Sequence, residues 1–179
     1  MANNQTTEEF TKTAVQSIVA GETHIGQVGR PLDIIDVTLT LDTSIYADGD
    51  VLSDTATLTN AMRVAAGGGT LRSIVLIDED DQGTALDVVF FKATQSLGTK
   101  NSAPNISDSA ARDCLGSVNI ATTDYIDLGG VRVATKRDLN LALESASGSR
   151  DIFIGTITRG GTPTYTANGL RVKIGIEQG

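Results

Sequence analysis

From residue 32 to the C-terminus, apolar and polar residues alternate in short runs, and this period of two is the strongest structural signal in the sequence. Clear examples are residues 35–41 (IDVTLTL), 139–143 (LNLAL) and 170–176 (LRVKIGI). Successive side chains of a strand point to opposite faces, so this spacing predicts strands with one buried face. Gly-rich turns separate about nine or ten such runs, and there is no room between them for the helices of a parallel sheet. The sequence therefore predicts an all-β fold, an antiparallel jelly-roll-like β-sandwich over residues 31–179.

Two neighbouring apolar runs predict a β-hairpin. They are residues 71–77 and 85–92, joined by the acidic segment 78–83 (DEDDQG). Residues 94–113 are polar and predict a loop with one short helical turn. Cys114 begins another strand, where a free cysteine usually behaves as a small hydrophobe, so we expect it to be buried.

Residues 1–30 differ from the rest of the chain and are predicted to be an N-terminal arm. Thr6 and Glu9 have the spacing of a capping box, and Phe10, Ala14 and Ile18 fall on one face of a helix. The same segment is rich in β-branched residues, so residues 7–19 are compatible with either a short helix or an extended strand. Three glycines and a proline then follow within residues 21–31 and indicate a linker.

Composition narrows the classes of partner. The chain has 22 acidic against 14 basic residues, a formal net charge of −8, and no basic run, so we expect no nucleic acid as a partner. No apolar run reaches the roughly 18–20 residues of a membrane span and no secretory signal opens the sequence, so we expect no membrane association. One cysteine and one histidine exclude an internal disulfide and a Cys/His-rich zinc site.

No arrangement of residues predicts catalysis, so we expect the protein not to be an enzyme and to use no cofactor. The single histidine, His24, lies in the Gly-rich linker, and neither a nucleophile elbow nor a phosphate-binding loop occurs. The acidic segment 78–83 begins like a calcium loop, but Val89 stands where that loop needs its bidentate glutamate. No metal site is therefore predicted, although calcium binding by another geometry stays open for this turn.

Five segments give the chain a resemblance to a known family. In order they are 24–29 (HIGQVG), 46–50 (YADGD), 68–78 (GGTLRSIVLID), 86–91 (LDVVFF) and 155–165 (GTITRGGTPTY). Together they resemble small virion structural proteins of tailed bacteriophages, of the head decoration or capsid-associated type. The resemblance extends over most of residues 24–176 and consists of turns and strands rather than catalytic signatures. It implies a structural role in a virion.

Combined with the arm, this resemblance implies a head decoration or cement protein that docks on the capsid exterior. The expected partners are the major capsid protein and further copies of this chain, in a homotrimer. Apolar residues of the arm and its histidine are the expected capsid or subunit contacts: Phe10, Val15, Ile18, His24, Ile25 and Val28. The alternative is a tail or fibre module that binds a receptor or carbohydrate. The absence of tryptophan weighs against the alternative, because sugar sites usually stack their ligand on aromatic rings.

Overall fold

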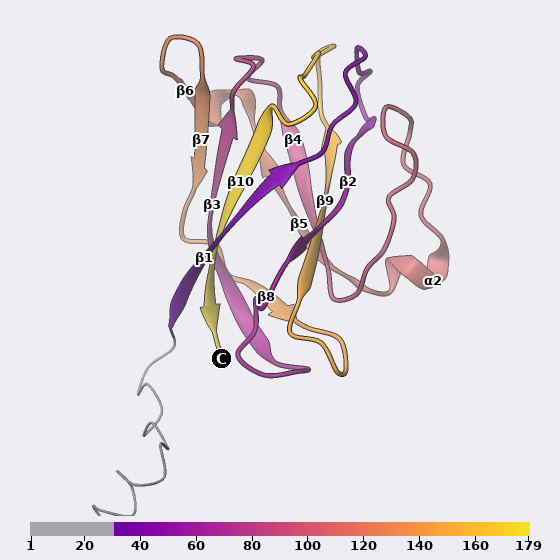
Figure 1. Cartoon of the computed structure of the whole chain (residues 1–179), viewed down its shortest axis with the longest axis vertical. Coiled ribbons are helices and arrows are strands. Elements are labelled where there is room, and N and C mark those ends of the chain that lie inside the picture. The colour runs from indigo at the N-terminus through magenta and orange to yellow at the C-terminus, as the bar shows by residue number, and fades with distance from the viewer. Residues whose placement is uncertain (1–30) are drawn as a thin grey trace, which may run out of the picture. The chain divides into compact units, whose positions relative to one another are not determined.

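Ten strands and two short helical segments make up residues 31–179, the part of the chain that the computed structural model describes (Figure 1). The strands of the first half are β1 (Leu32–Leu39), β2 (Val51–Leu58), β3 (Gly68–Asp78), β4 (Leu86–Phe91) and β5 (Cys114–Ile120). Those of the second half are β6 (Tyr125–Asp127), β7 (Arg132–Lys136), β8 (Leu141–Glu144), β9 (Ile152–Thr158) and β10 (Leu170–Gln178). The helical segments are α2 (Asp108–Ala111) and η1 (Thr122–Asp124).

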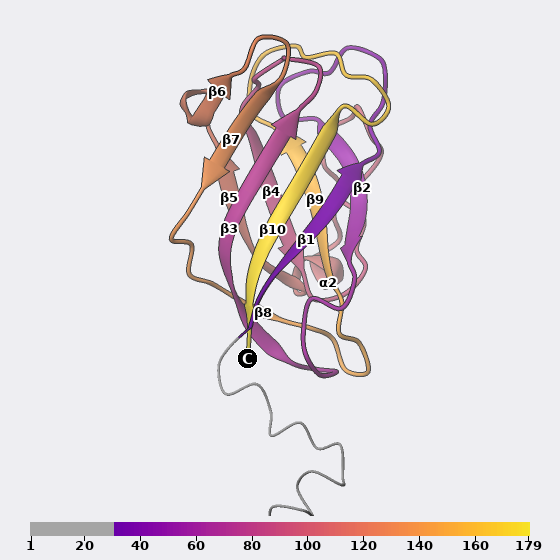
Figure 2. The same cartoon turned by 60° about the vertical axis from the view of Figure 1, so that its left-hand side comes forward.

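The strands form two antiparallel sheets packed face to face, and their order is that of a jelly roll. The six-stranded sheet runs β1-β10-β3-β7-β6, with β8 also paired to β3, and the four-stranded sheet runs β2-β9-β4-β5. Figure 2 shows the six-stranded sheet in front of the four-stranded one. Strands that follow one another along the chain mostly lie in opposite sheets, which is the double Greek-key arrangement. The predicted all-β, jelly-roll-like sandwich is therefore confirmed.

The predicted hairpin of residues 71–77 and 85–92 is wrong. Both runs are strands, but β3 pairs with β10, β7 and β8, whereas β4 pairs with β5 and β9 in the other sheet. The acidic turn therefore carries the chain from one sheet to the other. The sequence pattern does not distinguish the two cases, because a short polar turn joins reversed strands in both.

The core lies between the two sheets and uses the inward faces that the alternation marks. In β10, Val172 and Ile174 are fully buried, whereas Arg171 and Lys173, which alternate with them, are half-buried on the outer face. The largest side chains that fill this core are Tyr46, Tyr165, Phe90, Leu39, Leu52, Leu58, Met62, Leu71, Ile74, Leu76 and Leu86. Burial of this apolar surface is the main stabilising contribution to the fold.

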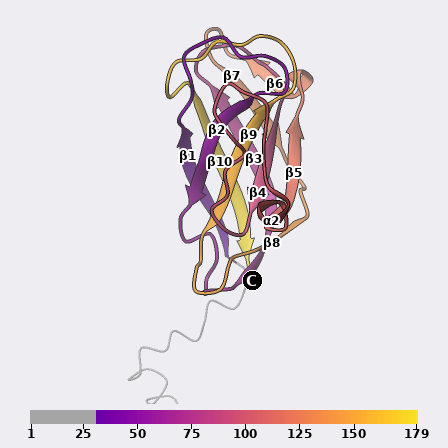
Figure 3. The same ribbon diagram turned by 90° about the vertical axis from the view of Figure 1, so that its right-hand side faces the viewer.

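A second, smaller cluster lies on the outer side of the four-stranded sheet. Phe91, Val51 and Ile157 are buried there beneath Leu97, which belongs to the long connection after β4. Figure 3 shows this connection, with α2, beside the four-stranded sheet. The predicted loop with one helical turn is thus confirmed, and Ser107 caps the helix by accepting a hydrogen bond from the Ala110 N–H.

The predicted arm, residues 1–30, lies outside the described residues, so the choice between helix and extended chain for residues 7–19 stays a prediction. The residues that the structure describes include no helix both long and apolar enough to cross a membrane.

Candidate functional site

Four loops gather at one end of the sandwich, the upper end in Figure 1. They connect β1 to β2, β3 to β4, β6 to β7 and β9 to β10. We call the residues 40–50, 78–85, 126–132 and 159–169 the loop end. The jelly-roll topology brings them together, because β1, β3 and β9 all run toward this end and the chain returns from it in β2, β4 and β10.

Backbone hydrogen bonds fasten the β1–β2 loop to the β9–β10 loop. The Leu41 N–H donates to the Ala167 carbonyl (2.9 Å), and the Tyr46 N–H donates to the Pro163 carbonyl (3.0 Å). Each loop thus satisfies backbone groups of the other, as buried or partly buried backbone requires. The two loops are therefore held together as one unit.

Side chains of the acidic turn fasten the same β9–β10 loop from the other side. The Asp80 carboxylate accepts from the Thr166 N–H (2.7 Å) and from the Thr166 hydroxyl (3.0 and 3.1 Å to its two oxygens). The Gln82 side-chain carbonyl accepts from the Thr164 N–H (3.3 Å). These contacts join segments more than eighty positions apart, so only the folded chain reveals them.

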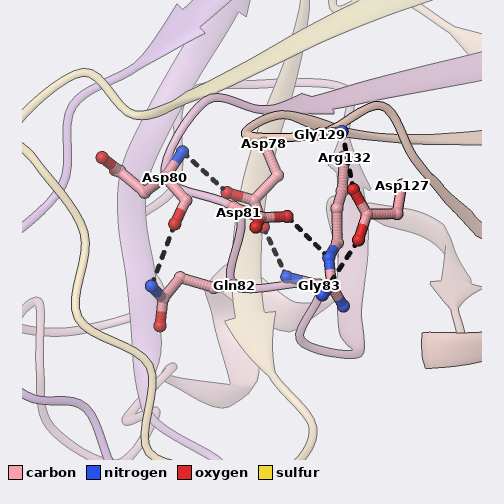
Figure 4. Close-up of polar contacts among 8 residues, drawn as sticks. All are labelled: Asp78, Asp80, Asp81, Gln82, Gly83, Asp127, Gly129 and Arg132. Carbon is pink, nitrogen blue, oxygen red and sulfur yellow. Dashed lines mark hydrogen bonds and ion pairs between the residues drawn. The ribbon is translucent and has the colours of Figure 1, made fainter.

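Asp78 is the buried centre of the turn, as Figure 4 shows. Its carboxylate accepts hydrogen bonds from the N–H groups of Gly83 (2.7 Å) and Asp80 (3.1 Å). Burial raises the pKa of Asp78 above its usual value, because desolvation disfavours the charged form more than these hydrogen bonds favour it. The carboxylate therefore fixes the shape of the turn from within.

Arg132 closes the turn against the β6–β7 hairpin (Figure 4). Its guanidinium forms ion pairs with Asp81 (2.7 Å) and Asp127 (3.7 Å), and the hydrogen bond that Arg132 donates to the Asp81 carboxylate raises the pKa of Arg132. The side chain lies over Gly83, whose φ of +58° and lack of a Cβ allow this close approach. A single arginine thus connects the second and third of the four loops.

Two tyrosines fill the space beneath the loop end. The rings of Tyr46 and Tyr165 meet edge to face with centroids 6.2 Å apart. The Tyr46 hydroxyl donates to the Leu52 carbonyl (2.9 Å) and accepts from the Asp42 N–H (2.6 Å), whereas the buried Tyr165 hydroxyl has no hydrogen-bond partner. Burial raises the pKa of both phenols, so both are neutral at physiological pH.

The carboxylates of the acidic turn point to separate partners and do not converge on a common point. Asp78 faces backbone N–H groups, Asp80 faces Thr166, and Asp81 faces Arg132 (Figure 4). Among the described residues, no group of three or more metal-ligating side chains is arranged to hold an ion. The side chains of Asp78, Asp80 and Asp81 are thus each engaged in contacts within the protein.

Acidic charge is concentrated at the loop end. It holds eight acidic and two basic residues, whereas the remainder of residues 31–179 holds eleven acidic and ten basic ones. The acidic residues of the loop end are Asp42, Asp48, Asp50, Asp78, Glu79, Asp80, Asp81 and Asp127, and the basic ones are Arg132 and Arg159. Most of the net negative charge of residues 31–179 therefore lies at one end.

Three large apolar side chains are exposed at the same end. The exposed fractions are 61% for Ile45, 66% for Ile126 and 65% for Leu128. Sequence reasoning singled out none of the three; Ile126 and Leu128 belong to a strand-like run, whose apolar residues are ordinarily assigned to the core. The Gly129-Gly130 turn beside Leu128 was the available signal, since such a hairpin tip is normally polar.

The capsid or subunit contacts predicted for the arm are not tested by the structure. Phe10, Val15, Ile18, His24, Ile25 and Val28 all lie outside the described residues, so their assignment stays a prediction. The expectation for Cys114 is wrong in part: it does begin strand β5, but its side chain is exposed. β5 is an edge strand, and Cys114 pairs with Phe91 beyond a register shift, where the sheet no longer covers it.

Comparisons with known proteins find distant likenesses among solved structures. No protein-family model and no curated protein sequence matches this chain. Similar solved structures include Desmodium yellow mottle tymovirus, at 12% identity over 85% of this chain and 82% of that one, with a TM-score of 0.28. They also include the K3 cleaved adhesin domain of Lys-gingipain from Porphyromonas gingivalis, at 13% identity over 86% and 95%, with a TM-score of 0.33.

Deformed wing virus carrying the GFP gene gives a third similar structure, at 11% identity over 99% of this chain and 85% of that one, with a TM-score of 0.33. Scores this low carry no argument about function. The assignment of the fold therefore rests on the strand order itself, which is that of a jelly-roll β-sandwich.

Proposed function

We propose that this chain is a non-enzymatic structural protein of a tailed-bacteriophage virion, a head decoration protein that docks on the capsid exterior. Its partners in this role are the major capsid protein and further copies of the chain in a homotrimer. Docking of many copies stabilises the shell, because each bound copy lowers the free energy of the assembled state only.

The observation that carries the proposal is the construction of the loop end. Hydrogen bonds of Asp80, ion pairs of Arg132 and backbone hydrogen bonds connect the four loops to one another. Together these loops expose apolar side chains. Because these contacts already order the loops, little conformational entropy is lost when a partner covers them, and the loop end therefore suits docking. The sequence resemblance to phage virion proteins supplies the biological setting.

The alternative, a tail or fibre module for carbohydrate, receives less support. Sugar binding relies on exposed aromatic faces, but no aromatic ring within residues 31–179 is exposed: Tyr46, Tyr165, Phe90 and Phe91 are buried, and Tyr125 and Phe153 are half-buried. Jelly rolls occur in lectins as well as in viral shells, so the fold alone does not choose between the two roles.

Immunogold labelling of intact particles from the source culture tests the location. An antibody against this chain is expected to label heads over their whole surface. Label confined to tails or fibres would favour the receptor-binding alternative, and particles without label would contradict the virion role altogether.

Variants of the arm test the predicted contacts. Replacing Phe10, Val15 and Ile18 together by serine is expected to weaken binding to heads at least about tenfold, because three apolar contacts are lost. Val64→Ser is the matched control, since Val64 is 60% exposed and lies far from the arm in sequence. Equal binding of the triple variant and the control would remove the arm from the docking surface.

A further inference from the structure

We propose that the loop end docks on a basic, partly apolar surface of a partner protein, with Ile45, Ile126 and Leu128 as its apolar contacts. The proposal deepens the decoration role by assigning a docking face within the sandwich, and it relies on that role only for the identity of the partner. It concerns residues distinct from the predicted contacts of the arm.

Hydrogen bonds restrain the backbone segments that carry Ile45 and Leu128. Ile45 precedes Tyr46, whose N–H is held by Pro163 and whose ring is buried in the core. The Leu128 N–H donates to the Val131 carbonyl (2.9 Å), which closes the hairpin tip on which Leu128 stands. Apolar side chains on supports of this kind bind with a small entropic cost, so their exposure favours a partner.

The net charge of the loop end determines which kind of partner surface it attracts. Eight acidic residues against two basic ones give this end a negative potential that attracts a surface rich in Lys and Arg and speeds its association. Several of these carboxylates are held in place: Asp42 accepts from the Ser44 N–H (2.7 Å), and this hydrogen bond lowers the pKa of Asp42. The Asp42 carboxylate, three positions before Ile45, is therefore favoured in its charged form.

The same charge disfavours the other occupants. A second copy would set its own eight acids against these, and nucleic acid would bring phosphates. The segment 1–30 has three acidic residues and two basic ones, which gives it no complementary charge. Of these classes of partner, a basic protein surface is the one that both covers the apolar side chains and neutralises the acidic residues of the loop end.

A pair of charge reversals locates the interaction. Asp48→Lys with Glu79→Lys changes two exposed loop-end acids whose side chains make no hydrogen bond or ion pair within residues 31–179; the Glu79 N–H still donates to the Gly169 carbonyl in the variant. The matched control, Asp54→Lys with Glu144→Lys, produces the same net charge at exposed positions outside the loop end. Because the control acids lie in β2 and β8, it separates position from total charge.

Two probes are used with the full-length chain in low salt. The first is an immobilised peptide of alternating Lys and Leu, with a Glu-Leu peptide of equal length as its negative counterpart. The second is head shells from the source culture that lack this protein. The loop-end reversal is expected to slow association with the Lys-Leu peptide and with the shells at least about fivefold relative to the matched control, because steering depends on local charge.

A serine pair tests the apolar part in the same assays. Ile45→Ser is expected to speed dissociation from both probes relative to Val64→Ser, which removes an equally exposed side chain outside the loop end. Equal effects of the two reversals, or of the two serine variants, on the Lys-Leu peptide would overturn the proposal, whatever the shells do. Shells that fail to bind wild-type chain while the peptide discriminates the variants would contradict the decoration role and leave the docking chemistry intact.

Discussion

At the scale of single residues, Tyr46 and Tyr165 offer a matched pair. Both rings are buried and touch each other, but only the Tyr46 hydroxyl has hydrogen-bond partners. Tyr46→Phe is expected to lower the free energy of unfolding by about 1–2 kcal/mol, because the Leu52 carbonyl loses its buried donor. Tyr165→Phe is expected to leave it unchanged within about 0.5 kcal/mol or to raise it, since no hydrogen bond is lost.

Urea denaturation of the two variants beside wild type measures both effects. An equal loss of stability in the two variants would show that the Tyr165 hydroxyl has a partner in solution. The comparison is clean because the substitution, the ring contact and the burial are the same at both positions.

At the scale of elements, Asp80 determines how firmly the β9–β10 loop is held. Asp80→Ala removes the acceptor for the N–H and hydroxyl of Thr166, and hydrogen exchange at the Thr166 amide is expected to accelerate. The cost in global stability is expected to stay near 1 kcal/mol, because the exposed Thr166 groups turn to water instead.

Asp48→Ala serves as the control, since Asp48 belongs to a loop of the same end and has no recorded bond to the β9–β10 loop. Hydrogen exchange followed by mass spectrometry of residues 159–169 makes the comparison. Unchanged exchange in the Asp80 variant would mean that the backbone contacts of the β1–β2 loop hold this segment by themselves.

At the scale of the whole molecule, the pH dependence of stability combines two carboxyls of opposite sign. Burial raises the pKa of Asp78, so the native state binds more protons than the unfolded chain between the unfolded pKa and the raised one. Its contribution to stability is therefore full below the unfolded pKa and declines as pH rises through that window. For Asp124, the hydrogen bond from Lys136 lowers the pKa, so its contribution is present above the unfolded pKa and declines as pH falls.

Chemical denaturation between about pH 3 and pH 7 tests both signs, a range that spans the ordinary aspartate pKa of about 3.9. The stability of wild type minus that of Asp78→Asn is expected to be larger at the acidic end. The same difference for Asp124→Asn is expected to be larger at the neutral end. The same sign of pH dependence for both variants would contradict the opposed pKa shifts.

The sequence by itself determined the strands and the burial of their faces. Alternation in residues 170–176 marks Val172 and Ile174 for the core and Lys173 for the surface, because the period of a strand is a local property of the backbone. The class of fold followed as well, since short strands with Gly-rich turns leave few ways to bury their apolar faces.

Only the tertiary structure decided which strands pair and what the loops do. The segments 71–77 and 85–92 read as a hairpin, yet they lie in different sheets, because pairing depends on partners such as β10 that are distant in sequence. The contact of Asp80 with Thr166 and the gathering of acids at one end have the same origin. Long-range pairing places these residues together, and a local sequence pattern carries no record of neighbours that arrive from more than eighty positions away.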